Sequence, residues 1–166
     1  MTIRRSYHHR GGQAPLLGVT IPEHFAAIAG THEDRTAVIG VPQGRRLSYA
    51  ELADATDDLA RGLLAQGFGP GDRIGIWSTN NVEWLLLQLA TARMGAVLVN
   101  INPAYRPKEL AYALEKSEVQ GLFTIPAFRS SDYAGMLREL IPALDGSAPE
   151  ELSCDFLPAL RRVVVY

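Results

Sequence analysis

The sequence predicts an α/β fold with a mostly parallel, twisted sheet flanked by helices. From Arg73 onward, strand-like and helix-like segments alternate with short connections. Such alternation needs crossover connections, which build parallel sheets covered by helices. A second observation is the apolar stretch 84–94, which has almost no polar face and is therefore typical of a buried helix. A third is a pair of capping-box sequences, at 20–23 and 48–51, ahead of the alternating region.

The segment before Arg73 is predicted to hold two helices and a hairpin. The capping boxes start the helices, and the second helix continues to Gly67. Between the helices, β-rich residues 36–41 and 46–48 flank Pro42-Gln43-Gly44, which predicts a small hairpin. The second helix is amphipathic, and the residues predicted to face the core are Leu52, Thr56, Leu59, Ala60, Leu63 and Leu64.

The alternating region resolves into named strands and helices. Gly95 stands between the apolar helix and the following strand, where the chain must turn tightly. The predicted strands are 73–78, 96–101, 121–125 and 163–166. The predicted helices start at Asn80 or Asn81, at Pro107 and at Asp132.

Composition excludes several classes of protein. The net charge is −2 and no basic run exceeds a pair, so the sequence lacks the electrostatic signature of a nucleic-acid-binding protein. Cys154 is the only cysteine, which rules out an internal disulfide and suits the cytoplasm. No stretch predicts a membrane span. We expect residues 1–19 to form a flexible tail and residues 20–166 to form one α/β unit.

The sequence offers no recognisable catalytic, cofactor-binding or metal-binding residue. Glycines 67, 69, 71 and 75 follow a helix and precede a strand, the reverse of the order in a phosphate-binding loop, so we interpret them as a structural turn. Neither lysine, Lys108 or Lys116, follows a glycine in a Walker-type loop. The histidines lack the spacing of a metal-binding or catalytic pair.

Two loops are the best candidates for contact with a ligand. In an open parallel sheet, ligands collect beyond the carboxyl ends of the strands, and two polar and aromatic loops are predicted there. The alternative is that the asparagines cap helices and the aromatic side chains pack in the core. The candidate residues are Trp77, Asn80 and Asn81 in one loop, and Asn102, Tyr105 and Arg106 in the other.

Three stretches in order resemble the adenylate-forming, or AMP-binding, superfamily and its acyl-CoA synthetase branch. Residues 47–52 (LSYAEL) resemble the first core motif of that superfamily. Residues 71–84, from GDRIGIW to NNVEW, resemble its next strand and helix, and residues 92–103 (ARMGAVLVNINP) resemble its second core motif. The sequence of residues 100–106 (NINPAYR) resembles that of the fatty-acid ligases within this superfamily. The resemblance covers 20–166 and implies the N-terminal subdomain of the acyl-CoA synthetase fold.

The resemblance implies a parent enzyme that joins a fatty acid to CoA. In this family ATP and the acid form an acyl-adenylate and pyrophosphate, and CoA then displaces AMP, with Mg²⁺ assisting. The phosphate loop, the ribose-binding Asp and the catalytic Lys of the family have no counterpart in this sequence, so we expect a truncated, inactive piece that needs a carboxy-terminal part. Its predicted partners are that part, fatty acid, ATP and CoA, and an uncovered surface would favour self-association.

A stand-alone α/β module is the alternative from another functional class. Such a module would bind a small molecule or a protein partner at the two loops named above. Acid-dependent ATP–pyrophosphate exchange by a chain extended past Tyr166 would separate the two hypotheses.

Overall fold

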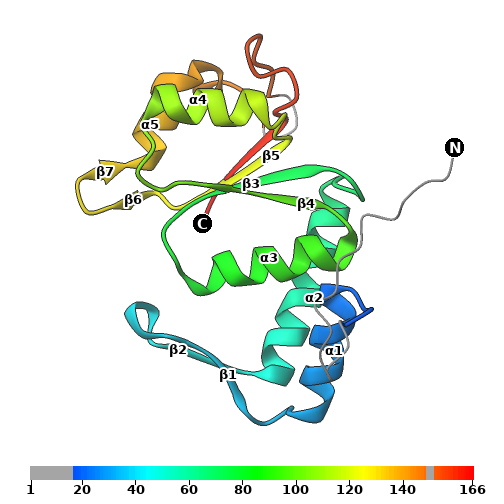
Figure 1. The fold of residues 1–166 in the computed structure, drawn as a ribbon. Coiled ribbons are helices and arrows are strands. Elements are labelled where there is room, and N and C mark those ends of the chain that lie inside the picture. Colours follow the sequence, from blue (N-terminus) through cyan, green and yellow to red (C-terminus); the bar gives the residue numbers. More distant parts are fainter. Residues whose placement is uncertain (1–16, 149–151) are drawn as a thin grey trace, which may run out of the picture.

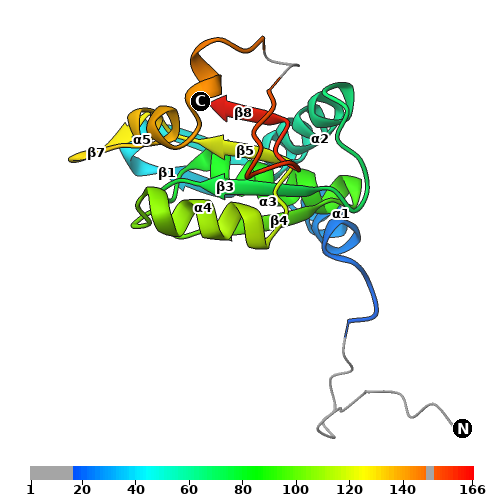
Figure 2. The same ribbon diagram turned by 90° about the horizontal axis from the view of Figure 1, so that it is seen from above.

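The computed structural model describes residues 17–148 and 152–166. Its centre is a four-stranded parallel sheet in the order β4-β3-β5-β8, which confirms the predicted α/β class. The arrows of β3, β5 and β8 point the same way in Figure 2. The strands are β3 (Arg73–Trp77), β4 (Val97–Ile101), β5 (Gly121–Thr124) and β8 (Arg162–Val165).

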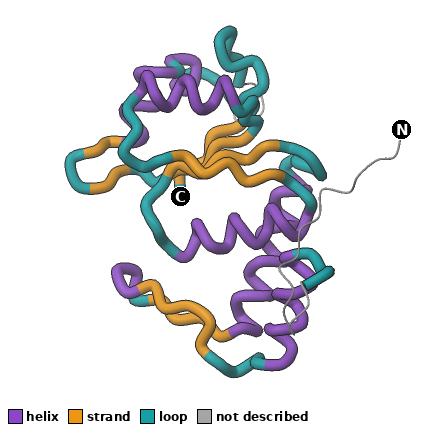
Figure 3. The backbone as a smooth tube through the Cα atoms, viewed as in Figure 1, coloured by secondary structure: helices purple, strands orange, loops and turns teal. Residues whose placement is uncertain are grey.

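Helices cover both faces of this sheet. Figure 1 shows α3, with α1 and α2 beyond it, on one side of the sheet and α4 with α5 on the other. The same layers surround the strands in Figure 3. The helices are α1 (Ile21–Thr31), α2 (Tyr49–Ala65), α3 (Val82–Met94), α4 (Pro107–Lys116) and α5 (Tyr133–Leu140), with short 3-10 turns η1 (Val41–Gln43) and η2 (Pro142–Asp145). Within the described part of the chain, no helix combines the length and apolarity that crossing a bilayer demands.

Strand β3 supplies side chains to both layers of the core. Ile74 and Ile76 are fully buried against residues of α2 and α3. Trp77 is fully buried on the opposite face, among residues of α4 and α5. A Cβ atom at Gly75 would lie 3.0 Å from Val119 on that second face, so glycine leaves room for the packing there. Because side chains alternate along a strand, one five-residue segment joins two separate hydrophobic clusters.

Helix α3 is packed on two sides, as its apolar sequence predicts. Leu87 and Ala90 pack with the sheet cluster. Val82 and Leu86 pack in a third cluster, formed with α1, α2 and the first hairpin. A helix that contacts neighbours on two sides needs an apolar surface all round, which accounts for its composition.

The first hairpin docks on the start of α3. It consists of β1 (Thr36–Gly40) and β2 (Arg45–Ser48), which pair antiparallel. The Val82 amide donates a hydrogen bond to Gln43 Oε1 at 2.9 Å. Arg45 forms an ion pair with Glu83 in the first turn of α3. The predicted hairpin is therefore confirmed, and polar contacts fix its position.

Most predicted helix starts are confirmed, while two details of the prediction differ. Thr20 and Ser48 form complete capping boxes, and Asn81 and Asp132 cap α3 and α5. Leu64 was predicted to face the core but is 49% exposed, because the buried stripe of α2 passes through its neighbour Leu63. The sequence also did not predict the small hairpin of β6 (Ala127–Phe128) and β7 (Ser131–Asp132).

The glycine-rich segment 67–72 is a turn, as predicted. Asp72 holds it by accepting hydrogen bonds from the Gly69 amide (2.9 Å) and from Gln120 Nε2 (2.8 Å). Asp72 also forms an ion pair with Arg161 at 2.6 Å. These contacts join the starts of β3, β5 and β8 at the amino edge of the sheet.

Gly95 makes the tight turn between α3 and β4. Its φ is +78°, in the left-handed region that favours glycine. The Gly95 carbonyl accepts a hydrogen bond from the Gly71 amide at 2.8 Å, so the two turns are coupled. A Cβ atom at Gly95 would lie 3.5 Å from Cβ of Pro70, which leaves room for a methyl group but little for a branched side chain.

We predict that Gly95→Val lowers the free energy of unfolding by about 1 to 3 kcal/mol, because valine is strained at positive φ and would crowd Pro70. Urea unfolding measures the change. The matched control is Gly62→Ala, since Gly62 is exposed within α2 with nothing within 4 Å of an added Cβ. That change should stabilise the chain by about 0.5 to 1 kcal/mol. Equal stability of Gly95→Val and the unaltered chain would contradict the proposed tight turn.

Candidate functional site

The two candidate loops lie at the carboxyl edge of the sheet. Strands β3 and β4 are parallel neighbours, and their register pairs Trp77 with Ile101. The loop after β3 leads to α3 and the loop after β4 leads to α4, on opposite faces of the sheet (Figure 1). Loops that diverge in this way open a crevice between them, which is where open α/β sheets bind ligands.

A cleft of about 510 Å³ occupies this position. It brings Asn80 and Asn102 together from the two loops. Its lining contains no ionisable side chain, and Trp84 is its one aromatic residue. The lining residues are Ser78, Thr79, Asn80, Trp84, Asn100, Ile101, Asn102 and Pro103.

Trp77 lies beneath the loops and does not line the cleft. Its side chain is fully buried, and its ring packs edge-on against Tyr133 with centroids 4.4 Å apart. Its Nε1 donates a hydrogen bond to the Asn102 carbonyl oxygen at 3.2 Å. Trp77 therefore supports the second loop from the core, in line with the alternative that the aromatic side chains pack.

Asn81 serves as a helix cap. Its Oδ1 accepts a hydrogen bond from the Trp84 amide at 2.7 Å, and its Nδ2 donates to Ser78 Oγ at 3.0 Å. Its Nδ2 also lies 3.4 Å from the hydroxyl oxygen of Tyr166, just beyond β8. These contacts occupy most of the hydrogen-bonding capacity of Asn81, so its neighbour Asn80 is the more accessible amide.

The second loop orders itself by local hydrogen bonds. Asn102 Oδ1 accepts a hydrogen bond from the Ala104 amide at 2.9 Å, a contact typical of an Asx turn. The Arg106 amide donates to Glu109 Oε2 at 3.1 Å at the start of α4. Tyr105 lies outside the cleft, in a separate hollow of about 270 Å³ that Lys108, Glu109 and Tyr112 also line. Tyr105 thus lines a different hollow from Asn80 and Asn102, although its amide donates a hydrogen bond to the Asn102 carbonyl at 3.0 Å.

Tyr133 is a site-supporting residue that the sequence analysis missed. Its hydroxyl donates a hydrogen bond to the Pro103 carbonyl oxygen at 2.9 Å, and only 1% of the residue is exposed. Burial raises the pKa of Tyr133 above its ordinary value, an effect that nearby Arg106 partly opposes. Trp77 and Tyr133 therefore hold consecutive carbonyl groups of the cleft wall. The only sequence signal was an aromatic residue directly after the Asp132 cap.

The described residues provide no site of ordinary metal-binding type. No group of three or more His, Cys, Asp or Glu side chains is close enough to hold an ion among residues 17–148 and 152–166. The cleft offers hydrogen bonding and apolar contact, without the charged groups that acid–base or metal chemistry uses.

An open α/β sheet with a crevice at its carboxyl edge is typical of a broad class of ligand-binding proteins. Sequence comparison identifies the family within that class. Residues 25–161 match the family of AMP-binding enzymes. This match spans most of the chain, which therefore belongs to that family. The resemblance seen in the three sequence motifs is confirmed.

Curated relatives are named as acyl-CoA ligases. The mitochondrial medium-chain acyl-CoA ligase ACSF2 of Danio rerio is 36% identical over 164 residues, which is 99% of this chain and 27% of the relative. The Homo sapiens protein of the same name is 37% identical over 149 residues, 90% of this chain and 24% of the relative. This chain thus spans about a quarter of the length of the curated relatives that it matches.

Solved structures share the fold. The inhibitor-bound N-terminal domain of FACL13 from Mycobacterium tuberculosis superposes with a TM-score of 0.71 and 21% identity, over 89% of this chain and 33% of that one. The N-terminal subdomain of NpsA from Klebsiella oxytoca, in complex with anthranilyl-AMSN, gives a TM-score of 0.60 and 27% identity, over 63% of this chain and 27% of that one. The fold is that found in the N-terminal domains of acyl-CoA synthetases.

We predict that Tyr133→Phe lowers the free energy of unfolding by about 0.5 to 1.5 kcal/mol, because the hydrogen bond from the buried Tyr133 to the Pro103 carbonyl is lost. Tyr112→Phe is the matched control, since Tyr112 is 66% exposed and should change stability by less than about 0.5 kcal/mol. Chemical denaturation measures both variants. If the two substitutions had equal effects, the hydroxyl of Tyr133 would not support the loop.

Proposed function

We propose that this chain forms the amino-terminal framework of an ATP-dependent fatty-acid–CoA ligase. The proposed reaction converts a fatty acid, ATP and CoA into acyl-CoA, AMP and pyrophosphate through an acyl-adenylate. The observation that carries the proposal is the match to AMP-binding enzymes over residues 25–161, together with relatives named as acyl-CoA ligases.

In this proposal the chain is a structural framework of the enzyme, and the catalytic residues lie in another part of the polypeptide. Stabilising the charge of a transferring phosphoryl group requires a phosphate loop, Mg²⁺ and a positioned cation. The sequence contains no such phosphate loop, and no group of three metal-ligating side chains stands together among residues 17–148 and 152–166. The relatives carry most of their length outside the matched region. ATP, Mg²⁺ and CoA are accordingly cofactors and substrates of the longer enzyme in this proposal.

The cleft at the carboxyl edge belongs to the substrate side of the proposed enzyme. Asn80 and Asn102 from its two loops remain the candidate ligand-facing residues, and Trp77 and Tyr133 fix the wall between them. The absence of charge from the lining favours an uncharged part of a substrate over a carboxylate or a phosphate. We further propose a cytoplasmic enzyme, as the single cysteine suggests.

The proposal also includes self-association of the isolated chain. The edge strand β8 ends in exposed Val165, and edge strands readily pair with other chains. Exposed Leu17, Val19 and Ile21 add an apolar surface beside α1. Such a surface is expected on a lobe that packs against another part of an enzyme.

We predict that the chain alone shows no ATP–pyrophosphate exchange when a carboxylic acid substrate is added. A fusion that continues after Tyr166 with the corresponding remainder of the Danio rerio relative should show exchange with medium-chain or long-chain fatty acids. A fusion in which the catalytic lysine of the family is replaced by alanine is the control and should be inactive. Exchange by the isolated chain would contradict the scaffold assignment. A folded fusion inactive towards fatty, aryl and amino acids would favour a stand-alone binding module.

A further inference from the structure

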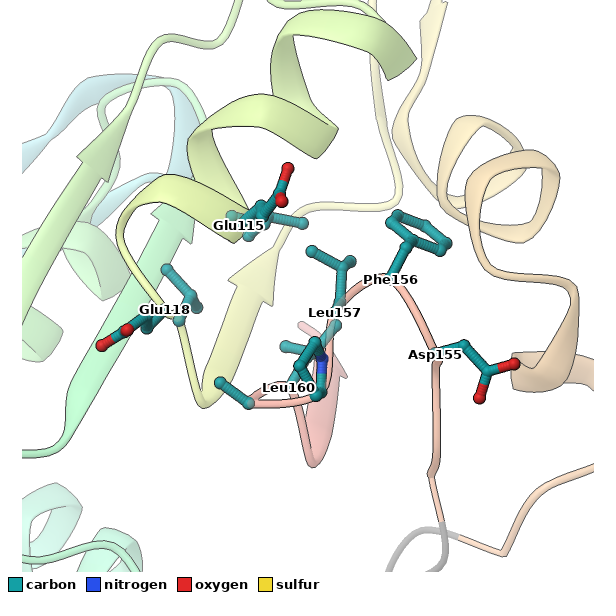
Figure 4. Close-up of a pocket in the computed structure, with 10 residues that line it drawn as sticks. Glu115, Glu118, Asp155, Phe156, Leu157 and Leu160 are labelled. Atoms are coloured by element: carbon teal, nitrogen blue, oxygen red, sulfur yellow. The ribbon is translucent and has the colours of Figure 1, made fainter.

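A second pocket lies at the amino edge of the sheet, opposite the candidate site. It has a volume of about 460 Å³ and lies between the end of α4 and the segment 155–160 that leads into β8 (Figure 4). That volume is within the range of small-molecule sites, about 300 to 1,000 Å³. Neither the family motifs nor the candidate loops contribute to its lining.

The floor of this pocket is aliphatic and buried. Four core residues form it, and each is 1–3% exposed: Leu114, Val119, Leu157 and Leu160. Phe156 stands at one side of the leucines in Figure 4, and 45% of its surface is exposed. An aliphatic group that entered would exchange contact with water for contact with this floor, which is favourable.

The rim of the pocket is acidic. Glu115, Glu118 and Asp155 line it, and no basic residue does. Glu118 is paired with Arg73 at 2.6 Å, whereas Glu115 and Asp155 have no ion-pair partner among residues 17–148 and 152–166. The carboxyl end of α4 adds the partial negative charge of its carbonyl groups.

The carboxylates lie around the leucines and point outward in Figure 4. They therefore remain hydrated and act on a charged group at the pocket mouth rather than inside it. Aliphatic chains that bear a terminal charge commonly bury the chain and leave the charge in water. A cation in that position would also lie near the exposed ring of Phe156, whose face attracts positive charge.

We propose that this pocket binds a primary aliphatic ammonium group, with the alkyl chain on the leucine floor and the ammonium at the pocket mouth beside Phe156, where the negative charges of Glu115 and Asp155 attract it. A fatty acid would fit the same floor but would carry its carboxylate into the acidic rim. The pocket therefore selects against the proposed substrate of the enzyme. This site is independent of the ligase proposal, because it needs neither ATP nor the carboxyl-edge cleft.

Three probes with the same alkyl chain test the assignment: n-hexylammonium, n-hexanol and n-hexanoate. Each is titrated into the isotopically labelled chain while amide shifts are followed by NMR. We expect shifts at 114–119 and 155–160, with hexylammonium binding about 2- to 5-fold more tightly than hexanol and hexanoate more weakly still. High salt should remove the preference, since the charges are exposed. A further titration uses Nα-acetyl-lysine methylamide, which represents a lysine side chain of a protein. Comparing its binding with that of hexylammonium distinguishes a protein side chain from a free amine as the source of the ammonium group.

The double variant Glu115→Gln, Asp155→Asn should bind hexylammonium and hexanol equally. The matched control is Glu33→Gln, Glu139→Gln, which removes two exposed carboxylates elsewhere and should keep the preference. Equal affinity of the unaltered chain for all three probes, or shifts confined to other residues, would overturn the proposal. Since these readouts involve binding to the chain itself, they can fail while the ligase proposal stands, and the reverse also holds.

Discussion

The burial of residues 74–77 of β3 is the constraint on which the rest of the structure depends. Its alternate side chains enter two clusters, Ile74 and Ile76 on the α3 side and Trp77 on the α4 and α5 side. A strand buried on both faces must be covered by helices on both, and only crossover connections supply them in a parallel sheet. The apolar surface of α3 and the glycine at position 75 are consequences of the same packing.

The two edges of the sheet are stabilised in different ways. At the amino edge, Asp72 joins three connections through Gly69, Gln120 and Arg161. At the carboxyl edge, the loops are held mainly from below, by Trp77 and Tyr133. Loops supported from the core leave their outer side chains free to vary, which suits a ligand-facing edge on a shared framework.

The parts of the fold that could be predicted from the sequence are those with local causes. The caps at Thr20, Ser48 and Asn81 were predictable because each bonds an amide within the same turn. Gly95 was predictable because it stands where a helix must turn into a strand. The family resemblance had the same origin, since its motifs are these capped helices and buried strands.

The parts that could not be predicted depend on contacts between distant residues. Trp77 was expected at a ligand-facing loop, yet its ring is held in the core by Tyr133, which is far away in sequence. Hydrophobic periodicity placed Leu64 on the buried face of α2. The periodicity of one helix cannot show which of the adjacent leucines, Leu63 or Leu64, packs against another element. The floor of the amino-edge pocket likewise combines α4 with the segment before β8.

Native-state hydrogen exchange tests the central role of β3 most directly. Amides that open only when the whole chain unfolds exchange most slowly. The account predicts that residues 74–77 exchange with the free energy of global unfolding, and that the hairpin of β1 and β2 exchanges at lower free energy because few of its residues are buried. Exchange of β3 as fast as that of the hairpin would show that the core does not depend on this strand.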